Sequence, residues 1–362
     1  MYVVRVAVLD GGDNVRFDPC SAVAGVIMQK LMPRLLQILL LLLSITAARH
    51  ARAADLGPWP SVSGMPWRSG VGNSFRPFEE WRGRPLDVCV AWHPHRTWEE
   101  LRKANGEVVE RLAGMKCRLS MGIAMLPKTH SGQFAECAAG KFDDSYRAVA
   151  ERLVGWGHGN AILRIGWEAN GPRSGDGDGG GFPWGIEGDV EPYIACFRRI
   201  VGVMRGVSQK FVVEWAMKKA TENMGGRPIS DAWPGDDWVD LVGIDYYDGY
   251  PAYRDAGAWS RDYAAKADGG PRGLGAWLTF AKSRGKQLAV PEWGVRNKRG
   301  ASDDNALFVE RMVEFFRENA ADIAYEAYFN PYSGANARIF SVYPEGNNPK
   351  AAAKYLEAYR PK

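Results

Sequence analysis

The chain has 362 residues, of which 46% are hydrophobic and 24% are charged, the balance of an ordinary globular protein. Its formal net charge at pH 7 is only +4, and no long run of Lys and Arg is present, which argues against nucleic acid as a partner. Aromatic residues make up 12%, a content common in proteins that stack against sugar rings and also in large cores. The length allows either two domains or one α/β barrel.

The N-terminal segment has the layout of an export signal. Lys30 and Arg34 form a basic region, an apolar run follows over 35–45, and small residues then offer a cleavage site. The apolar run is too short to span about 30 Å of hydrocarbon as a helix, although an uncleaved membrane anchor is the alternative. We therefore expect residues 1–53 to be removed, and we expect residues 54–362 to form a secreted or periplasmic protein.

The predicted mature part keeps four cysteines, and export would allow them to form disulfides. These are Cys89, Cys117, Cys137 and Cys196. Their spacing shows no C-x-x-C metal pattern, and four cysteines permit three pairings. Buried free thiols with one bridge and a full set of bridges both remain open.

Short apolar segments alternate with amphipathic ones along the rest of the chain. The predicted strands are at 61–67, 87–92, 117–126, 161–168, 210–217, 239–247, 286–294 and 322–330. Several are near-continuous apolar runs, as expected of parallel strands that are covered on both faces. The predicted helices are at 97–114, 143–157, 189–206, 274–285, 304–320 and 349–360, where apolar residues recur at i, i+3, i+4 and i+7.

This alternation predicts an α/β fold, a single (β/α)8 TIM barrel preceded by a signal peptide. Thr97 and Glu100 form a capping box at the start of the first predicted helix. The main alternative, an open doubly wound sheet, would usually have a Gly-rich phosphate loop after its first strand, and the sequence has none.

Carboxylates, aromatics and histidines collect where the predicted strands end, which in a barrel is the mouth that carries the active site. They are Trp92, His93 and His95 after the second strand, Trp167, Glu168 and Asn170 at the fourth, Glu214 and Trp215 in the fifth, Asp245, Tyr246, Tyr247 and Asp248 at the sixth, Glu292 and Trp293 at the seventh, and Tyr328 at the eighth. This clustering is the main functional signal of the sequence.

Glu168 and Glu292 each follow an apolar strand directly and lie beside a tryptophan. Strands four and seven lie across the mouth of a barrel from each other, so the two side chains can converge. Retaining glycosidases need two carboxyl groups about 5–5.5 Å apart, one as nucleophile and one as acid/base. An apolar wall can raise the pKa of the acid/base. Two strand-end glutamates in ordinary ion pairs are the alternative.

Several segments resemble glycoside hydrolase family 26 and its clan A relatives. They are ILRIGWEANG (162–171) with FPWG (182–185), VVEWA (212–216), WPGDDWVDLVGIDYYD (233–248) and PEWG (291–294). The resemblance implies that Glu168 is the acid/base and Glu292 the nucleophile. It also implies that the Tyr247 hydroxyl bonds the nucleophile, with Tyr246 as the second candidate. Arg164 fits a bracing arginine on strand four, and a core-edge ion pair is the alternative for it.

Further residues at the mouth are predicted to contact the substrate. They are Trp92, His93, Trp167, Asn170, Trp184, Trp215, Tyr246, Trp293 and Tyr328. Simple packing remains open for each tryptophan, and a structural role remains open for His93 and His95. The loop at 172–181 contains Asp176 and Asp178 but lacks the ligand ladder of an EF-hand, so we expect no metal there.

One departure from the family limits the substrate prediction. Family mannanases usually carry a histidine directly before the acid/base, and here that residue is Trp167. The candidate substrates are therefore β-mannan, another plant β-glycan or a bacterial exopolysaccharide.

The sequence predicts a retaining endo-β-glycosidase that acts by double displacement on a polysaccharide or oligosaccharide, as a monomer. We expect it to work without a metal or organic cofactor, and without nucleic acid or membrane partners after signal cleavage. A barrel that binds carbohydrate without catalysis and a transglycosylase on the same scaffold are the alternatives.

Overall fold

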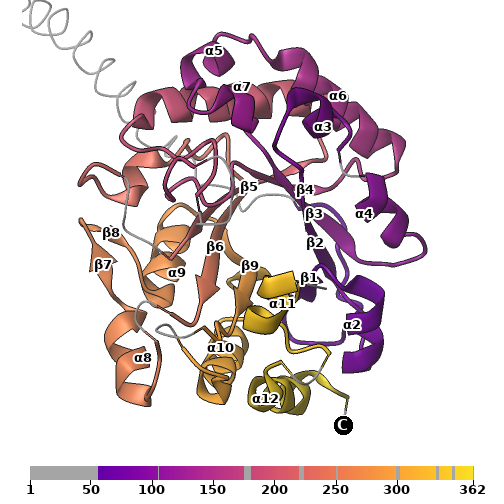
Figure 1. Cartoon of the computed structure of the whole chain (residues 1–362), viewed down its shortest axis with the longest axis vertical. Coiled ribbons are helices and arrows are strands. Elements are labelled where there is room, and N and C mark those ends of the chain that lie inside the picture. The colour runs from indigo at the N-terminus through magenta and orange to yellow at the C-terminus, as the bar shows by residue number, and fades with distance from the viewer. Residues whose placement is uncertain are drawn as a thin grey trace, which may run out of the picture. The chain divides into compact units, whose positions relative to one another are not determined.

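Eight parallel strands close into a barrel in the computed structural model, and helices surround it (Figure 1). The structure describes residues 56–104, 106–174, 181–219, 224–249, 252–298, 302–331, 334–344 and 347–361, so the predicted signal peptide lies outside the described residues. Around the barrel the strands follow the order β1-β10-β9-β6-β5-β4-β3-β2. The strands of the sequence thus close in chain order, as predicted for a (β/α)8 barrel.

The barrel strands are β1 (Ser69–Gly72), β2 (Val88–Trp92), β3 (Arg118–Ile123), β4 (Ile162–Ile165), β5 (Val212–Lys218), β6 (Leu241–Tyr247), β9 (Gln287–Gly294) and β10 (Ile323–Phe329). A separate hairpin joins β7 (Lys266–Ala267) and β8 (Gly270–Pro271). The helices are α2 (Phe75–Arg82), α3 (Trp98–Arg102), α4 (Gly106–Arg111), α5 (Phe134–Ala138), α6 (Asp143–Gly155), α7 (Val190–Val207), α8 (Ala256–Tyr263), α9 (Leu274–Ser283), α10 (Ala306–Glu318), α11 (Gly334–Phe340) and α12 (Pro349–Tyr359), with short 3-10 turns at Lys128–His130 and Ile229–Ala232.

The core has two layers because successive side chains of a strand point to opposite faces. Inside the barrel, one apolar cluster contains Val90, Ile162, Val212, Leu241 and Ala289. A larger cluster lies between the outer faces of the strands and the surrounding helices. An inward residue therefore faces the barrel axis, and its two neighbours in the strand face the helices.

The predicted first strand at 61–67 is wrong. That segment is a loop, and the strand β1 follows it. The Asp87 carboxylate accepts hydrogen bonds from the amides of Val62, Ser63 and Ser69, which holds the loop against the barrel. The sequence SGVG of β1 has little strand propensity, because glycine weakens a strand. Gly70 is needed for a close approach of two backbones, since a Cβ there would lie 2.1 Å from the Val88 carbonyl oxygen.

Two other predicted elements are shorter or divided. The helix predicted at 97–114 is split into α3 and α4, with Ala104 in a left-handed conformation (φ 54°). Its N-cap is confirmed, since the Thr97 side chain accepts from the Glu100 amide at 3.2 Å. The strand predicted at 161–168 ends at Ile165, so Glu168 lies in the turn that follows β4.

All four cysteines that were considered for pairing form disulfides. Cys89 is bonded to Cys117, which ties β2 to the residue before β3. Cys137 of α5 is bonded to Cys196 of α7. Along the described stretches, no helix has the length and apolarity needed to cross a membrane.

Candidate active site

Glu292 points into the barrel because the ladder between β6 and β9 is irregular. The pairing shifts between Gly243 and Asp245, so that Asp245 lies opposite Glu292. Pro291, which cannot donate to a ladder, lies within the shifted segment. Both Ala289 and Glu292 consequently face the barrel interior although three positions separate them.

Three side chains donate hydrogen bonds to the Glu292 carboxylate. Arg164 Nη2 and Trp92 Nε1 each lie 2.8 Å from Oε1, and the Tyr247 hydroxyl lies 2.9 Å from Oε2. Glu292 is only 6% exposed, so these donors replace the water that would otherwise stabilise its negative charge. The predicted contacts of Arg164 and Tyr247 with Glu292 are present.

Arg164 is fully buried and lies among three carboxylates. Its Nη2 is 2.8 Å from Asp245 Oδ2 as well as from Glu292, and its Nε is 3.6 Å from Glu214 Oε1. Burial opposes the charged guanidinium, but the surrounding carboxylates outweigh it and raise the pKa of Arg164. The side chain therefore supplies a permanent positive charge beneath Glu292.

Glu168 is presented by a strained turn after β4. Gly166 (φ 58°) and Glu168 (φ 54°) both have left-handed backbone conformations, which are costly for a residue other than glycine. A Cβ on Gly166 would also lie 2.3 Å from Met125 Sδ, so this position requires glycine. The Glu168 amide donates to the Ala216 carbonyl at 2.9 Å, which ties the turn to β5.

The carboxyl groups of Glu168, Asp245 and Glu292 converge. One oxygen of each lies within 4.8 Å of the others. Although part of the Glu168 side chain is exposed, its carboxyl is buried. Burial and the charge of Glu292 together raise the pKa of Glu168 to about 7, against the opposing charges of Lys218 and Arg164. Glu168 can thus hold a proton near neutral pH, while Glu292 is surrounded by donors.

Asp245 lies at the barrel mouth as predicted, and it belongs to the site itself, a role that the sequence did not predict. Burial raises its pKa well above the usual range, and the charges of Glu292 and Glu168 add to this effect while Arg164 opposes it. Asp245 lies two positions before Tyr247 on β6, and this even spacing, which puts both on the inner face, was the available signal. Among the described residues, only Glu168, Asp245 and Glu292 are grouped closely enough to hold a metal ion.

Three of the residues predicted to contact the substrate face away from the site, and these predictions are wrong. Trp215, Tyr246 and Trp293 are neighbours in sequence of inward residues, so strand alternation turns them toward the helices. Trp215 packs against Trp277 of α9, and Tyr246 bonds Asp262 of α8. Trp293 packs against α10 and donates to Glu326 Oε2. All three are buried.

Two more of the predicted substrate contacts are also covered. Trp184 is fully buried, donates to the Trp167 carbonyl at 2.8 Å and stacks on Phe182. Tyr328 is fully buried and donates to the Phe340 carbonyl at 3.0 Å. Neither ring has a face left for a sugar. Trp167 is only 3% exposed, so it also packs rather than presents a stacking surface.

Asn170 and His93, the remaining predicted substrate contacts, are enclosed by the protein. Asn170 is buried and exchanges two hydrogen bonds with the Lys218 backbone, which fixes the end of β5. His93 is buried, and burial lowers its pKa to about 3, so its ring is neutral. Neither ring nitrogen of His93 has a hydrogen-bond partner among the residues that the structure describes. Asp176 and Asp178 lie outside the described residues.

Trp92, also predicted to contact the substrate, remains partly exposed at the site. Its indole fits between two glycines, since a Cβ would lie 2.7 Å from the ring at Gly72 and 2.9 Å from it at Gly122. Phe329 contacts its edge at a centroid distance of 5.5 Å. Trp92 is thus held in place while its N–H points to Glu292.

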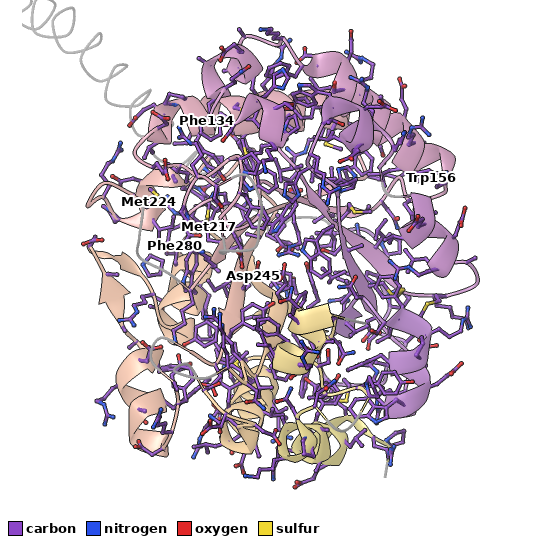
Figure 2. The ribbon with its side chains drawn as sticks, in the orientation of Figure 1. Phe134, Trp156, Met217, Met224, Asp245 and Phe280 are labelled. Carbon is purple, nitrogen blue, oxygen red and sulfur yellow. A yellow bond between two sulfur atoms is a disulfide. The ribbon has the colours of Figure 1, made fainter. Side chains whose placement is uncertain are left out.

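A cleft of about 1260 Å³ begins at Trp92, and we call it the rim cleft. Its lining includes Trp92, His95, Arg96, Glu100, Glu107, Glu110, Lys128, Arg152 and Trp156. Figure 2 shows Asp245 at the centre of the ring of strands and Trp156 among the helices at its edge. The rim cleft therefore runs outward along α3 and α4 from Trp92, whose N–H contacts Glu292.

Comparison with known proteins identifies the family that the chain resembles. Residues 175–267 match the model of glycosyl hydrolase family 26. A mannan endo-1,4-β-mannosidase of Bifidobacterium adolescentis is 26% identical over 155 residues, which make up 41% of this chain and 15% of that protein. The chain thus spans a small part of the curated relative that it matches. The family resemblance predicted from the motifs is confirmed.

Solved structures share the barrel. A modular endo-β-1,4-mannanase from Cellulomonas fimi has a TM-score of 0.58 at 16% identity, covering 81% of this chain and 70% of that one. A family 26 β-mannanase from Bacteroides ovatus has a TM-score of 0.51 at 13% identity, covering 81% of this chain and 89% of that one. At such identities the likeness concerns the fold alone, and it confirms the predicted (β/α)8 barrel.

Proposed function

We propose that this chain, which resembles glycosyl hydrolase family 26, is a retaining endo-β-glycosidase that hydrolyses a β-linked polysaccharide. The observation that carries the proposal is the pair of carboxyl groups of Glu168 and Glu292, which have unlike surroundings and approach so closely that one oxygen of each lies within 4.8 Å of the other. Retaining enzymes have a separation of about 5–5.5 Å, whereas inverting enzymes need about 6.5–9.5 Å to admit a water molecule.

Each carboxyl group suits one role in double displacement. Glu292 attacks the anomeric carbon, and the bond to the leaving oxygen breaks as Glu168 gives that oxygen its proton. Water then enters, Glu168 takes a proton from it, and the hydroxide displaces Glu292 from the sugar. Trp92, Arg164 and Tyr247 hold the Glu292 carboxylate during both steps.

The rim cleft favours a polymer as the substrate. It begins at Trp92, beside Glu292, and its volume of about 1260 Å³ accommodates sugars beyond the one that reacts. The relatives named above are mannanases, which makes β-mannan one candidate. Trp167 fills the position of the family histidine and is packed against Trp184, so a bacterial exopolysaccharide is the second candidate.

We also propose that the protein acts outside the cytoplasm as a monomer. Two disulfides support this location, since such bonds persist in oxidising compartments. The basic and apolar pattern before residue 53 is consistent with export.

The proposal is tested with the purified protein, β-mannan, other plant β-glycans and bacterial exopolysaccharides. We expect new reducing ends from one of them, and proton NMR should show that the first product has the β configuration. Glu292→Ala should abolish hydrolysis but retain polymer binding. A first product of α configuration, or hydrolysis by Glu292→Ala at the wild-type rate, contradicts the proposal. Binding without hydrolysis by the wild type indicates a carbohydrate-binding barrel, and transfer to an added acceptor sugar indicates a transglycosylase.

A further inference from the structure

We infer that Glu214 and Tyr325, deep in the barrel, are positioning residues that hold the Arg164 guanidinium against the nucleophile. The inference rests on the proposed function, since it assigns Glu292 that role. Neither residue touches the space where the sugar reacts, so both act through Arg164. Their connection to Glu292 is a continuous series of polar contacts across the barrel.

The series begins on β3 and ends on β9. The Ser120 and Tyr325 hydroxyl oxygens are 2.9 Å apart, and the Tyr325 hydroxyl donates to Glu214 Oε2 at 2.6 Å. Since the single proton of Tyr325 is directed to Glu214, Ser120 is the donor to Tyr325. Glu214 Oε1 then faces Arg164 Nε at 3.6 Å, and Arg164 Nη2 donates to Glu292 at 2.8 Å.

Complete burial makes these contacts consequential. Water does not screen the charges of Arg164 and Glu214, because both side chains are completely buried. The same holds for the hydroxyl groups of Ser120 and Tyr325, which are also completely buried. Neither Arg164 Nε nor Glu214 Oε1 has a hydrogen-bond partner within the part of the chain that the structure describes. Each is therefore compensated by the charge of the other, and removal of one leaves the other buried without compensation.

The surroundings leave Glu214 little freedom to move. Arg164 and Glu214 are paired in the β4–β5 ladder, so their side chains leave the sheet side by side. On the far side, a Cβ at Gly243 would lie 2.3 Å from Glu214 Oε1. The glycine thus makes room for the carboxylate, while Tyr325 fixes its other oxygen. Burial raises the pKa of Glu214 to about 7, with Arg164 and the Tyr325 hydrogen bond opposing this effect.

The geometry explains why Arg164 needs a second contact. Its guanidinium is planar, so the direction of Nε determines where Nη2 points. Nη2 lies 2.8 Å from both Asp245 and Glu292. Without Glu214 on the Nε side, the group can turn toward Asp245 alone, and Glu292 then loses one of its two Oε1 donors.

The experiment compares two Tyr–Glu pairs, one inside the barrel and one outside it. Glu214→Gln and Tyr325→Phe alter the inner pair. Glu326→Gln and Tyr359→Phe are matched controls, because Tyr359 donates to the buried Glu326 at 3.0 Å on the helix side of the strands. Hydrolysis kinetics across pH and thermal unfolding are measured for all four variants and the wild type.

We expect each inner variant to lower kcat by about tenfold or more with KM changed by less than about twofold, as loss of a transition-state contact requires. Tyr325→Phe removes no charge, so a lower kcat at unchanged KM in this variant reports a looser hold of Arg164 on Glu292 and not the loss of a charge. The outer variants should lower thermal stability and leave kcat and the pH profile unchanged.

The outcomes separate this inference from the proposed function. If the wild type hydrolyses a glycan and the inner variants keep its kcat as the outer variants do, the positioning role is wrong and the proposed function stands. If the wild type hydrolyses none of the glycans, both are overturned. If Glu214→Gln does not fold, Tyr325→Phe decides alone.

Discussion

The Tyr247 hydroxyl and the Trp92 indole N–H approach different oxygens of Glu292, Tyr247 at 2.9 Å from Oε2 and Trp92 at 2.8 Å from Oε1. They come from β6 and β2, so the Glu292 carboxylate, the proposed nucleophile, is held from two sides of the barrel. Arg164 adds a charged donor to Oε1. A carboxylate that is held at both oxygens is fixed in the orientation from which it can attack.

The Tyr247 contact gives a first prediction. Tyr247→Phe removes one donor to Glu292 and leaves the ring packed against Phe340. We expect kcat to fall by about 10²-fold, the loss typical for one stabilising donor in an active site. Steady-state kinetics check this, with Tyr359→Phe as the control. An unchanged kcat in Tyr247→Phe would mean that the hydroxyl does not serve the nucleophile.

The raised pKa of Glu168 predicts an alkaline limit to activity. Glu168 must be protonated to act as the acid, and its pKa is raised to about 7, so activity should fall as the pH rises through about 7. Glu168→Gln should abolish this limb and lower kcat by about 10²–10⁴-fold on a polysaccharide. On an aryl glycoside with a good leaving group, which needs no acid, the loss in the first step should be much smaller. An alkaline limb that persists in Glu168→Gln would assign the acid to another residue.

The same shift has a consequence for stability. A carboxyl group with a raised folded-state pKa favours folding when protonated, so its contribution is fully present below its ordinary value of 4.5 and is lost as the pH rises toward about 7. Glu168→Gln should therefore raise Tm at pH 8 by about 2–4 °C relative to the wild type. The difference should vanish below pH 4.5. Thermal unfolding at several pH values checks this, and a lower Tm for the variant at pH 8 would contradict it.

Gly243 gives a test of crowding beneath the site. Gly243→Ala would place a methyl group 2.3 Å from Glu214 Oε1, so the carboxylate must move away from Arg164. We expect lower kcat and a loss of about 1–3 kcal/mol of stability, the usual cost of overpacking. Gly202→Ala on α7 is the control, because nothing lies within 4 Å of its added Cβ, and it should be neutral or stabilising. Equal activity in the two variants would show that Glu214 tolerates displacement.

Most of the barrel could be predicted from the sequence because parallel buried strands are apolar and their helices are amphipathic. Seven predicted strands overlap the barrel strands from β2 to β10. The strand β1 was missed, because SGVG lacks the bulky residues that identify a strand and its glycines serve a close approach to Val88. The disulfide pairing could not be chosen, because it depends on which helices and strands become neighbours.

The centre of the site was also predictable, but its side-chain directions were not. Glu168, Glu292, Arg164 and Tyr247 converge as the motifs implied. Trp293 was misplaced because a residue beside an inward carboxylate faces the helices. To apply strand alternation, one must know which residue of each strand faces inward. In β9 the register shift near Pro291 breaks the alternation, so the sequence alone does not show which residues face inward. The tertiary partners of Glu214, namely Tyr325 and Gly243, come from distant parts of the chain and leave no local signal.

Covalent trapping tests the central claim most directly. A 2-deoxy-2-fluoro β-glycoside with a good leaving group, matched to the sugar of the hydrolysed glycan, should form a slowly hydrolysed glycosyl-enzyme. Mass spectrometry of the digested protein should locate one added sugar on the peptide that contains Glu292. We predict this label in the wild type and its absence in Glu292→Ala. A label on another carboxylate, or turnover that inverts configuration without a covalent adduct, would contradict the account.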